Sequence, residues 1–370
     1  MTRSRCFRRF ALIAFLAAGS SEIPARPIAA AADTSIKPPA TRVAADAPHL
    51  PQAPTVIVPP HRGADGKIDP DVPNATDDPR GSALDGGRWT AVPNSHMDDV
   101  TYDGPLADAI EGNSGPPSII AAWGGATLDT RNHALLVWGG GHADYWGNEV
   151  YAFDLKTLRW TRLNDPAPIA GWNGTSSDIL PDGTPSARHT YDSLTFLPAS
   201  GQMFEAGSAA SLQTGSGTTK SWLFNPTTRA WRQAADYTGA FYGVVSAYDP
   251  ADQCVYAMSF GTMAAHPGLQ RYDPRANAWT AIGGLGISDY HMTAAIDPAD
   301  HILVAVGAGH LNVVNLGTGA VASPPGSGDL TVQNGNAPGF VWDPSIDEFV
   351  DRGVPHESGR IAVLHREVSR

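Results

Sequence analysis

The sequence predicts an all-β protein built as a β-propeller, because one unit of about fifty residues recurs along the chain. Each copy carries a short marker, most often Asp-Pro, between two apolar runs. The second positions of the five markers are residues 129, 198, 249, 297 and 343, so the spacings are 69, 51, 48 and 46 residues. Four short strands at this period are typical of a propeller blade, whose sheet must stack on its neighbours to bury both faces.

The segments of one unit follow a constant order. An apolar run precedes the marker, as at 193–196 and 292–295, and a second apolar run follows it, as at 134–138. A glycine cluster then leads to a third run such as 149–154. A tryptophan closes the unit at Trp160, Trp231 and Trp279. We expect this tryptophan to lie in the fourth, outermost strand and to pack between blades.

The segment Arg88-Trp89-Thr90 copies the closing strand Arg159-Trp160-Thr161 of the first unit. We therefore expect it to supply the fourth strand of a blade whose first three strands come from the C-terminal region. Such a mixed blade joins the ends of the ring and removes exposed sheet edges. The alternative is that Trp89 is a lone surface residue in a loop.

The fifth unit begins like the others at 340–344, but residues 351–357 lack the usual apolar run and glycine cluster. Two interpretations follow. Residues 360–364 supply a third strand and complete a five-bladed ring, or the natural C-terminus is missing and the last twenty residues are a non-native tail. The prediction is thus four complete four-stranded repeats plus one split or truncated blade.

The chain divides by composition into four segments. Residues 1–32 read as a signal peptide, because four arginines precede the apolar stretch 10–18. Residues 33–84 form a Pro/Ala-rich linker or arm, 85–350 the propeller, and 351–370 an atypical C-terminal segment. This organisation predicts a secreted or periplasmic protein. Once Cys6 is removed with the leader, Cys254 is left alone, so no intramolecular disulfide is expected.

Charge and hydropathy exclude several kinds of partner. The net charge is −12, only 17% of the residues are charged, and no basic stripe is present. Such a chain is a poor candidate for binding nucleic acid. Beyond the leader no apolar run is long enough for a membrane span. We expect a monomer that binds a glycan or another polar ligand.

The best copy of the unit runs from Trp138-Gly139-Gly140-Gly141-His142 to Trp160. This pattern resembles the kelch-type propellers, whose best-known enzyme relative is galactose oxidase, over residues 86 to 350. The resemblance implies the fold and says little about chemistry, because kelch propellers host enzymes, glycan binders and scaffolds. The copper centre of galactose oxidase needs a cysteine cross-linked to a tyrosine. Cys254 lies in a predicted second strand, so copper-radical chemistry is not expected.

The repeat register predicts that polar residues gather at one mouth of the central channel. His142 and His310 both lie 13 residues after their markers, and Tyr191, Tyr242 and Tyr290 lie seven residues before theirs. The candidate catalytic residues are His142, Arg188, His189, Tyr191 and His310. The candidate ligand-binding residues are Asp144, Tyr145, Trp146, Tyr242, Tyr290 and His291. A concave mouth with convergent polar groups is the usual place for a ligand; the alternative is that these tyrosines only pack between blades.

Three functions fit this set of residues. The first is binding of a carbohydrate or similar polar ligand at the mouth. The second is β-elimination on a uronic-acid glycan, in which Arg or His⁺ neutralises the carboxylate while His and Tyr move protons. Propeller polysaccharide lyases, the ulvan lyases among them, are similar in their inventory of residues. The third is a protein-interaction scaffold. The sequence requires no cofactor, although a divalent metal at the histidine cluster is an alternative.

Overall fold

The computed structural model describes residues 95–169, 178–210, 215–237, 239, 242–260, 268–328, 330–352 and 361–364. The chain divides into two compact units, residues 1–69 and 70–370, and every described residue belongs to the second. The predicted signal peptide, the linker, the closing strand with Arg88-Trp89-Thr90 and most of 351–370 therefore lie outside the described residues.

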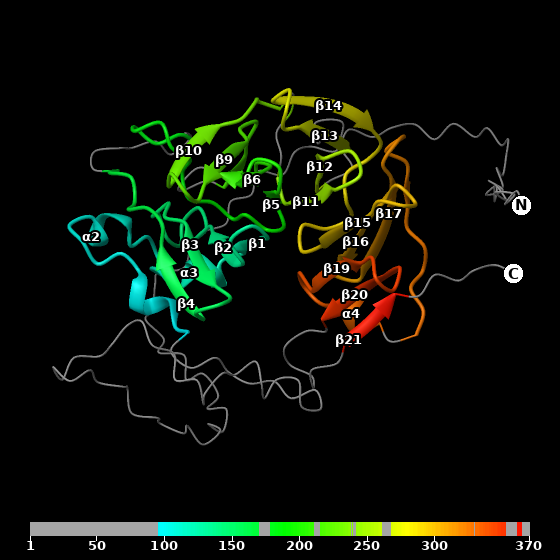
Figure 1. Cartoon of the computed structure of the whole chain (residues 1–370), viewed down its shortest axis with the longest axis horizontal. Helices are drawn as coiled ribbons and strands as arrows, with labels where there is room; N and C mark the ends of the chain where they lie inside the picture. The colour runs from blue at the N-terminus through cyan, green and yellow to red at the C-terminus, as the bar shows by residue number, and fades with distance from the viewer. Residues whose placement is uncertain are drawn as a thin grey trace, which may run out of the picture. The chain divides into compact units, whose positions relative to one another are not determined.

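Four antiparallel four-stranded sheets follow one another in a propeller arrangement (Figure 1), so the prediction of an all-β propeller is confirmed. Adjacent sheets meet through their first strands: β1 contacts β5, β5 contacts β11, and β11 contacts β15. Blade 1 comprises β1 (Gly125–Asp129), β2 (Ala134–Trp138), β3 (Tyr151–Asp154) and β4 (Arg159–Arg162). Blade 2 comprises β5 (Leu194–Leu197), β6 (Gln202–Glu205), β9 (Trp222–Asn225) and β10 (Ala230–Gln233).

Blade 3 comprises β11 (Val244–Asp249), β12 (Cys254–Ser259), β13 (Leu269–Asp273) and β14 (Ala278–Gly283). Blade 4 comprises β15 (Thr293–Asp297), β16 (Ile302–Gly307), β17 (His310–Asn315) and β18 (Val321–Ala322). A fifth sheet contains β19 (Gly339–Asp343), β20 (Glu348–Arg352) and β21 (Ile361–Leu364), and β19 contacts β15. β21 pairs antiparallel with β20, in the place expected for a third strand.

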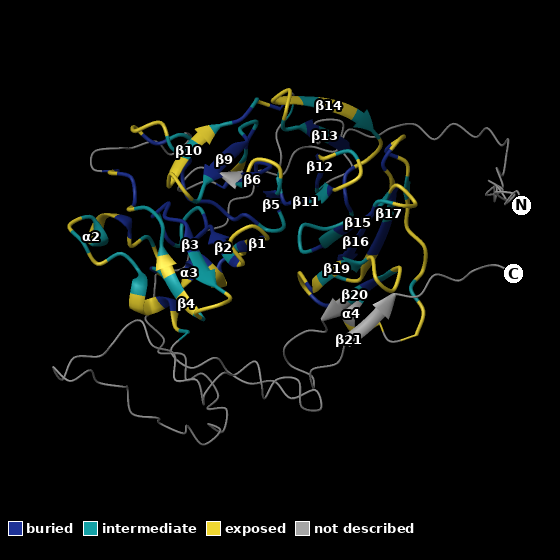
Figure 2. Ribbon diagram, in the orientation of Figure 1, coloured by how far each residue is buried: buried dark blue, intermediate teal, exposed yellow. Residues whose placement is uncertain are grey.

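The core lies between the blades, because alternate residues of a strand face opposite neighbours. In β6, Met203 packs in one cluster with Trp138 of blade 1. The next residue, Phe204, stacks on Tyr272 of blade 3 with ring centroids 4.3 Å apart. The second strands are consequently buried on both faces (Figure 2). Cys254 begins one of these strands and is a buried free thiol.

The closing tryptophans seal each blade against the one before it. The ring of Trp231 in blade 2 lies 4.7 Å from that of Trp138 in blade 1, and Trp279 in blade 3 lies 5.9 Å from Phe204 in blade 2. The prediction that the closing tryptophans pack between blades is confirmed for Trp231 and Trp279. Trp160 instead donates its indole N–H to the carbonyl of Ser95 at 2.8 Å.

The marker aspartates have a local structural role. Oδ1 of Asp249, Asp297 and Asp343 accepts the backbone N–H two residues ahead, each at 2.8 Å. An Asp side chain that bonds the backbone in this way stabilises the tight turn between the first two strands of a blade. The repeated marker is therefore a turn signal and does not belong to the site.

Short helical segments and a small hairpin lie in the connections. They are η1 (Met97–Val100), α2 (Ala107–Ile110), α3 (Ser118–Ala121), α4 (Thr331–Asn334), β7 (Ala209–Ala210) and β8 (Ser216–Gly217). The segment before β1 packs on the long loop 139–150 of blade 1: Trp146 N–H donates to the carbonyl of Ile110 at 2.8 Å, and Asn113 N–H donates to that of Ala143 at 2.9 Å. Across the described ranges, no helix has the length and hydrophobicity needed to cross a bilayer.

Candidate functional site

Aromatic and imidazole rings form one continuous array where the segments leading into the first strands of blades 1 to 4 meet. Each ring contacts at least one other member, with centroids 4.0 to 6.5 Å apart. We call this set the ring array; it consists of Trp123, His142, His189, Tyr191, Tyr242, Tyr290 and His291. Six of these seven residues were predicted to gather from the repeat register, and Trp123 was not assigned.

Three tyrosines from equivalent positions of blades 2, 3 and 4 form the centre of the ring array. Tyr191 lies 5.6 Å from Tyr290 and 6.4 Å from Tyr242, and Tyr242 lies 6.5 Å from Tyr290. Burial, together with the neighbouring Tyr242, raises the pKa of Tyr191. Its hydroxyl therefore remains protonated at neutral pH and is able to donate a hydrogen bond.

The histidines extend the ring array on both sides of the exposed Trp123. The ring of His189 lies 4.7 Å from Trp123 and 4.4 Å from His142. His291 lies 6.4 Å from Trp123 and 4.0 Å from Tyr290. Trp123 keeps 47% of its surface exposed. Since Trp123 and His291 both lie six residues before their markers, the repeat register also contained the signal that would have assigned Trp123.

Two carboxylates bind imidazoles of the ring array. Asp144 Oδ2 lies 3.1 Å from His189 Nε2, and Asp289 Oδ1 lies 2.9 Å from His291 Nδ1. Burial lowers the pKa of both His142 and His189, although Asp144 acts in the opposite direction. These two imidazoles are neutral at neutral pH and are able to accept a proton. Asp289 was missed, because no acidic residue occupies its register position in the other units.

Gly141 allows the Asp144–His189 pair to form. Its backbone has φ of 85°, in the left-handed region that favours glycine. A Cβ there would lie 2.8 Å from His189 Nε2 and would overlap Asp144 Oδ2. The Gly141 N–H also donates to the carbonyl of Arg188 at 3.2 Å. The glycine run of the unit therefore lets the loop of blade 1 approach the segment that carries His189.

Asp192 follows Tyr191 in sequence and connects three blades. Its backbone N–H donates to Val244 at 3.2 Å, and its carbonyl accepts from Ser246 at 2.9 Å. Its Oδ2 accepts the backbone N–H of Ala294 in blade 4 at 2.8 Å. Asp192 is half-buried as a residue, and burial raises the pKa of its carboxyl well above the usual range for Asp. Asp192 holds the segments that carry the tyrosines.

Arg188 does not reach the ring array, contrary to its assignment as a substrate-facing residue. Its side chain is fully buried, lies 3.5 Å from Glu205 and stands over the ring of Trp138 at 5.5 Å. Its Nε donates to the carbonyl of Ser186 at 3.1 Å. Burial raises the pKa of Glu205 to about 7, although Arg188 acts to lower it. This guanidinium compensates a buried carboxyl and is not available to a ligand.

His310 lies outside the contacts of the ring array, although its offset from the marker equals that of His142. It was expected at the channel mouth with His142, but it is the first residue of β17, where it pairs with Gly307 and is exposed. The reason is the length of the loop. Residues 139–150 separate β2 from β3, whereas only residues 308–309 separate β16 from β17. The long loop folds back over blade 1, and the short turn passes directly into the next strand.

Tyr145 and Trp146 lie in the expected loop but point into the protein. Tyr145 is buried, and its hydroxyl donates to Glu149 Oε1 at 2.7 Å. Trp146 is half-buried against the apolar cluster that contains Ile110 and Tyr151. Both side chains support the loop. They point into the protein and do not face a ligand, contrary to the expectation.

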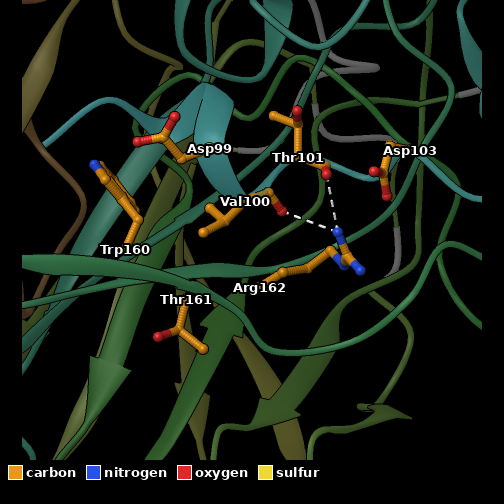
Figure 3. Close-up of a pocket in the computed structure, with 7 residues that line it drawn as sticks. All are labelled: Asp99, Val100, Thr101, Asp103, Trp160, Thr161 and Arg162. Carbon is orange, nitrogen blue, oxygen red and sulfur yellow. Dashed lines mark hydrogen bonds between the residues drawn. The ribbon is translucent and has the colours of Figure 1, made fainter. Parts of the chain in front are cut away.

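A separate hollow of about 410 Å³ lies at the outer edge of blade 1 (Figure 3). Its lining residues are Asp99, Val100, Thr101, Asp103, Trp160, Thr161 and Arg162. Arg162 Nη1 donates to the carbonyls of Val100 at 2.9 Å and Thr101 at 3.0 Å. These bonds fasten η1 to β4, and the hollow contains no residue of the ring array.

No protein-family model matches the sequence, and no curated protein matches it either. Within the part of the chain that the structure describes, no group of three or more His, Cys, Asp or Glu side chains is arranged to hold a metal ion. The chemistry of the site rests on the geometry of the ring array and its two carboxylates.

Proposed function

We propose that this propeller binds a carbohydrate at the ring array. The observation that carries the proposal is the exposed ring of Trp123, which is continuous with rings from the three following blades. A flat aromatic surface packs against the apolar C–H face of a sugar ring. Asp144, Asp289 and the neutral imidazoles supply hydrogen-bond acceptors for hydroxyl groups, as a specific polar ligand requires.

The backbone under the ring array supports a preorganised site. Trp123 and Tyr191 have φ of 48° and 49°, in the left-handed region that non-glycine residues rarely adopt. Tyr191 N–H donates to the carbonyl of Trp123 at 2.8 Å, which couples the two segments. Such strain persists only where the surroundings over-determine it, and it gathers at binding sites. A rigid site loses little conformational entropy when the ligand binds.

The test compares two variants of blade 1 with matched exposure. Trp123→Ala removes a ring that is 47% exposed, and Leu128→Ala removes a side chain that is 46% exposed and has no part in the ring array. We expect Trp123→Ala to weaken glycan binding of the full chain at least about tenfold, or about 1.4 kcal/mol. Leu128→Ala should leave it unchanged, with both variants melting cooperatively. Equal affinity of the two variants would show that the ring array is not the site.

A second candidate is a polysaccharide lyase acting by β-elimination. The Asp144–His189 hydrogen bond favours it, since a neutral imidazole oriented by a carboxylate is suited to removing a proton. Arg188 is buried, so the cation that neutralises a uronate would have to come from elsewhere. Incubation with acidic polysaccharides, followed by the absorbance of the unsaturated product, tests this candidate. An unchanged absorbance with every polymer excludes it.

The proposal also includes three predictions from the sequence: the kelch type of the propeller, its closing strand and its export. The glycine run 139–141 followed by Trp160 supports a ring of the kelch type, and Arg88-Trp89-Thr90 supports a closing strand that contains these three residues. The arginine-led apolar stretch at the N-terminus supports export. The mass of the mature protein recovered from its producing cell tests the last point, since cleavage near residue 32 is expected.

A further inference from the structure

We infer that the glycan bound at the ring array carries free, positively charged amino groups. This inference rests on the proposed function and names the chemical class of its ligand. It follows from the charges that surround the rings and from the way in which nearby basic side chains are already engaged.

In the described connections on the face that carries the ring array, acidic residues outnumber basic ones. Strands alternate in direction, so the loops after each second strand and the connections between blades lie on this same face. Residues 106–115, which pack on the loop 139–150, contain Asp108 and Glu111 and no Lys or Arg. A face with one sign of charge attracts ligands of the opposite sign.

Basic side chains on this face are already engaged. Within the described parts of the loops that follow each second strand and of the connections between successive sheets, Lys and Arg occur at positions 188 and 220 alone. Arg188 is buried against Glu205, and Lys220 forms an ion pair with Asp236. A polyanionic glycan would therefore meet carboxylates without a compensating cation, which disfavours binding.

The ring array offers two complementary contacts to an ammonium group. Asp144 and Asp289 are each more than a quarter exposed, and each engages only one oxygen with its histidine in the contacts above. The faces of Trp123 and of the three tyrosines attract cations through their quadrupoles. Carboxylates beside aromatic faces are the arrangement that recognises a protonated amine, and a sugar that carries one also stacks on Trp123.

The experiment measures binding of four hexasaccharides to the full chain by calorimetry at about pH 6 and low salt. The four are a β-1,4-glucosamine hexamer, its N-acetylated form, cellohexaose and hexagalacturonate. We expect the glucosamine hexamer to bind at least about tenfold more tightly than the other three, with an affinity that falls as salt is added. Asp144→Asn and Asp289→Asn should each reduce that preference about fivefold.

Asp347→Asn is the matched control, since Asp347 is an exposed residue of the turn between β19 and β20, a turn on the opposite face. It should leave all four affinities unchanged. If acetylated, neutral or acidic hexamers bind as tightly as the amine, the inference is wrong while the proposed function stands. If none of the four binds, the proposed function fails as well. The two carboxylates lie in different blades, so misfolding of one variant leaves the other to decide.

Discussion

The carboxyl of Asp192 accepts the backbone N–H of Ala294 at 2.8 Å, although the two residues are 102 positions apart in the chain. The bond joins the segment before blade 2 to the first strand of blade 4. Because backbone bonds from Asp192 also reach blade 3, one residue ties together three of the segments that carry the ring array.

Removal of this bond should destabilise the protein. Asp192→Ala leaves the Ala294 N–H without its acceptor, which costs about 1–3 kcal/mol of unfolding free energy. Asp192→Asn keeps an acceptor oxygen and should retain most of the stability. Urea unfolding of both variants measures the difference. Equal loss in both would mean that the carboxyl charge, and not the hydrogen bond, is required.

The raised pKa of Asp192 also predicts that the stability difference between wild type and Asp192→Asn depends on pH. Burial raises the pKa of Asp192 in the folded state, so its favourable contribution is complete below the pKa of the unfolded chain and is lost as the pH rises. Wild type should therefore lose stability relative to Asp192→Asn as the pH rises above about 4, the pKa of Asp in the unfolded chain. A constant difference over this range would contradict the raised pKa.

The buried pair Arg188–Glu205 should show a similar trend at higher pH. Burial raises the pKa of Glu205 to about 7, so its contribution to stability is complete below the unfolded pKa and disappears as the pH rises through about 7. Glu205→Gln should flatten this part of the stability curve. Arg188→Ala should cost about 3–5 kcal/mol, because it leaves a buried carboxyl without its partner. Thermal unfolding from about pH 5 to 9 measures both effects.

Alanine substitutions at two glycines with nearly the same φ distinguish the effect of backbone strain from that of a steric clash. Gly141 and Gly183 have φ of 85° and 86°, but only at Gly141 would a Cβ meet other atoms. Gly183→Ala should cost about 1–2 kcal/mol and leave glycan binding intact. Gly141→Ala should cost at least as much and should also weaken binding, because it displaces Asp144 or His189. Binding by Gly141→Ala at wild-type affinity would remove that pair from the site.

The two histidines at equal offsets should behave differently. His142→Ala removes a ring that packs on His189 and should weaken glycan binding by about 1 kcal/mol or more. His310→Ala changes an exposed residue at the start of β17 and should affect neither binding nor melting. Weaker glycan binding by His310→Ala would show that His310 belongs to the site after all.

The sequence alone determined the propeller, because its signals are local. The marker aspartates cap turns two residues away, glycines follow the second strands, and closing tryptophans recur at the blade period. Each of these signals depends on a few neighbouring residues and can therefore be recognised in the sequence without knowledge of the fold. The convergence of Tyr191, Tyr242 and Tyr290 was also predictable, because equivalent positions of stacked repeats share one end of the ring.

Only the tertiary structure decided which polar residues join the ring array. The burial of Arg188 follows from its contacts with Glu205 and Trp138, and Trp138 belongs to another blade. The separation of His310 from His142 follows from loop lengths that a common offset does not reveal. Asp289 and the bond from Asp192 to Ala294 have no counterpart in the repeat. Side-chain direction at a blade junction depends on packing between segments far apart in the chain, and no local pattern encodes that packing.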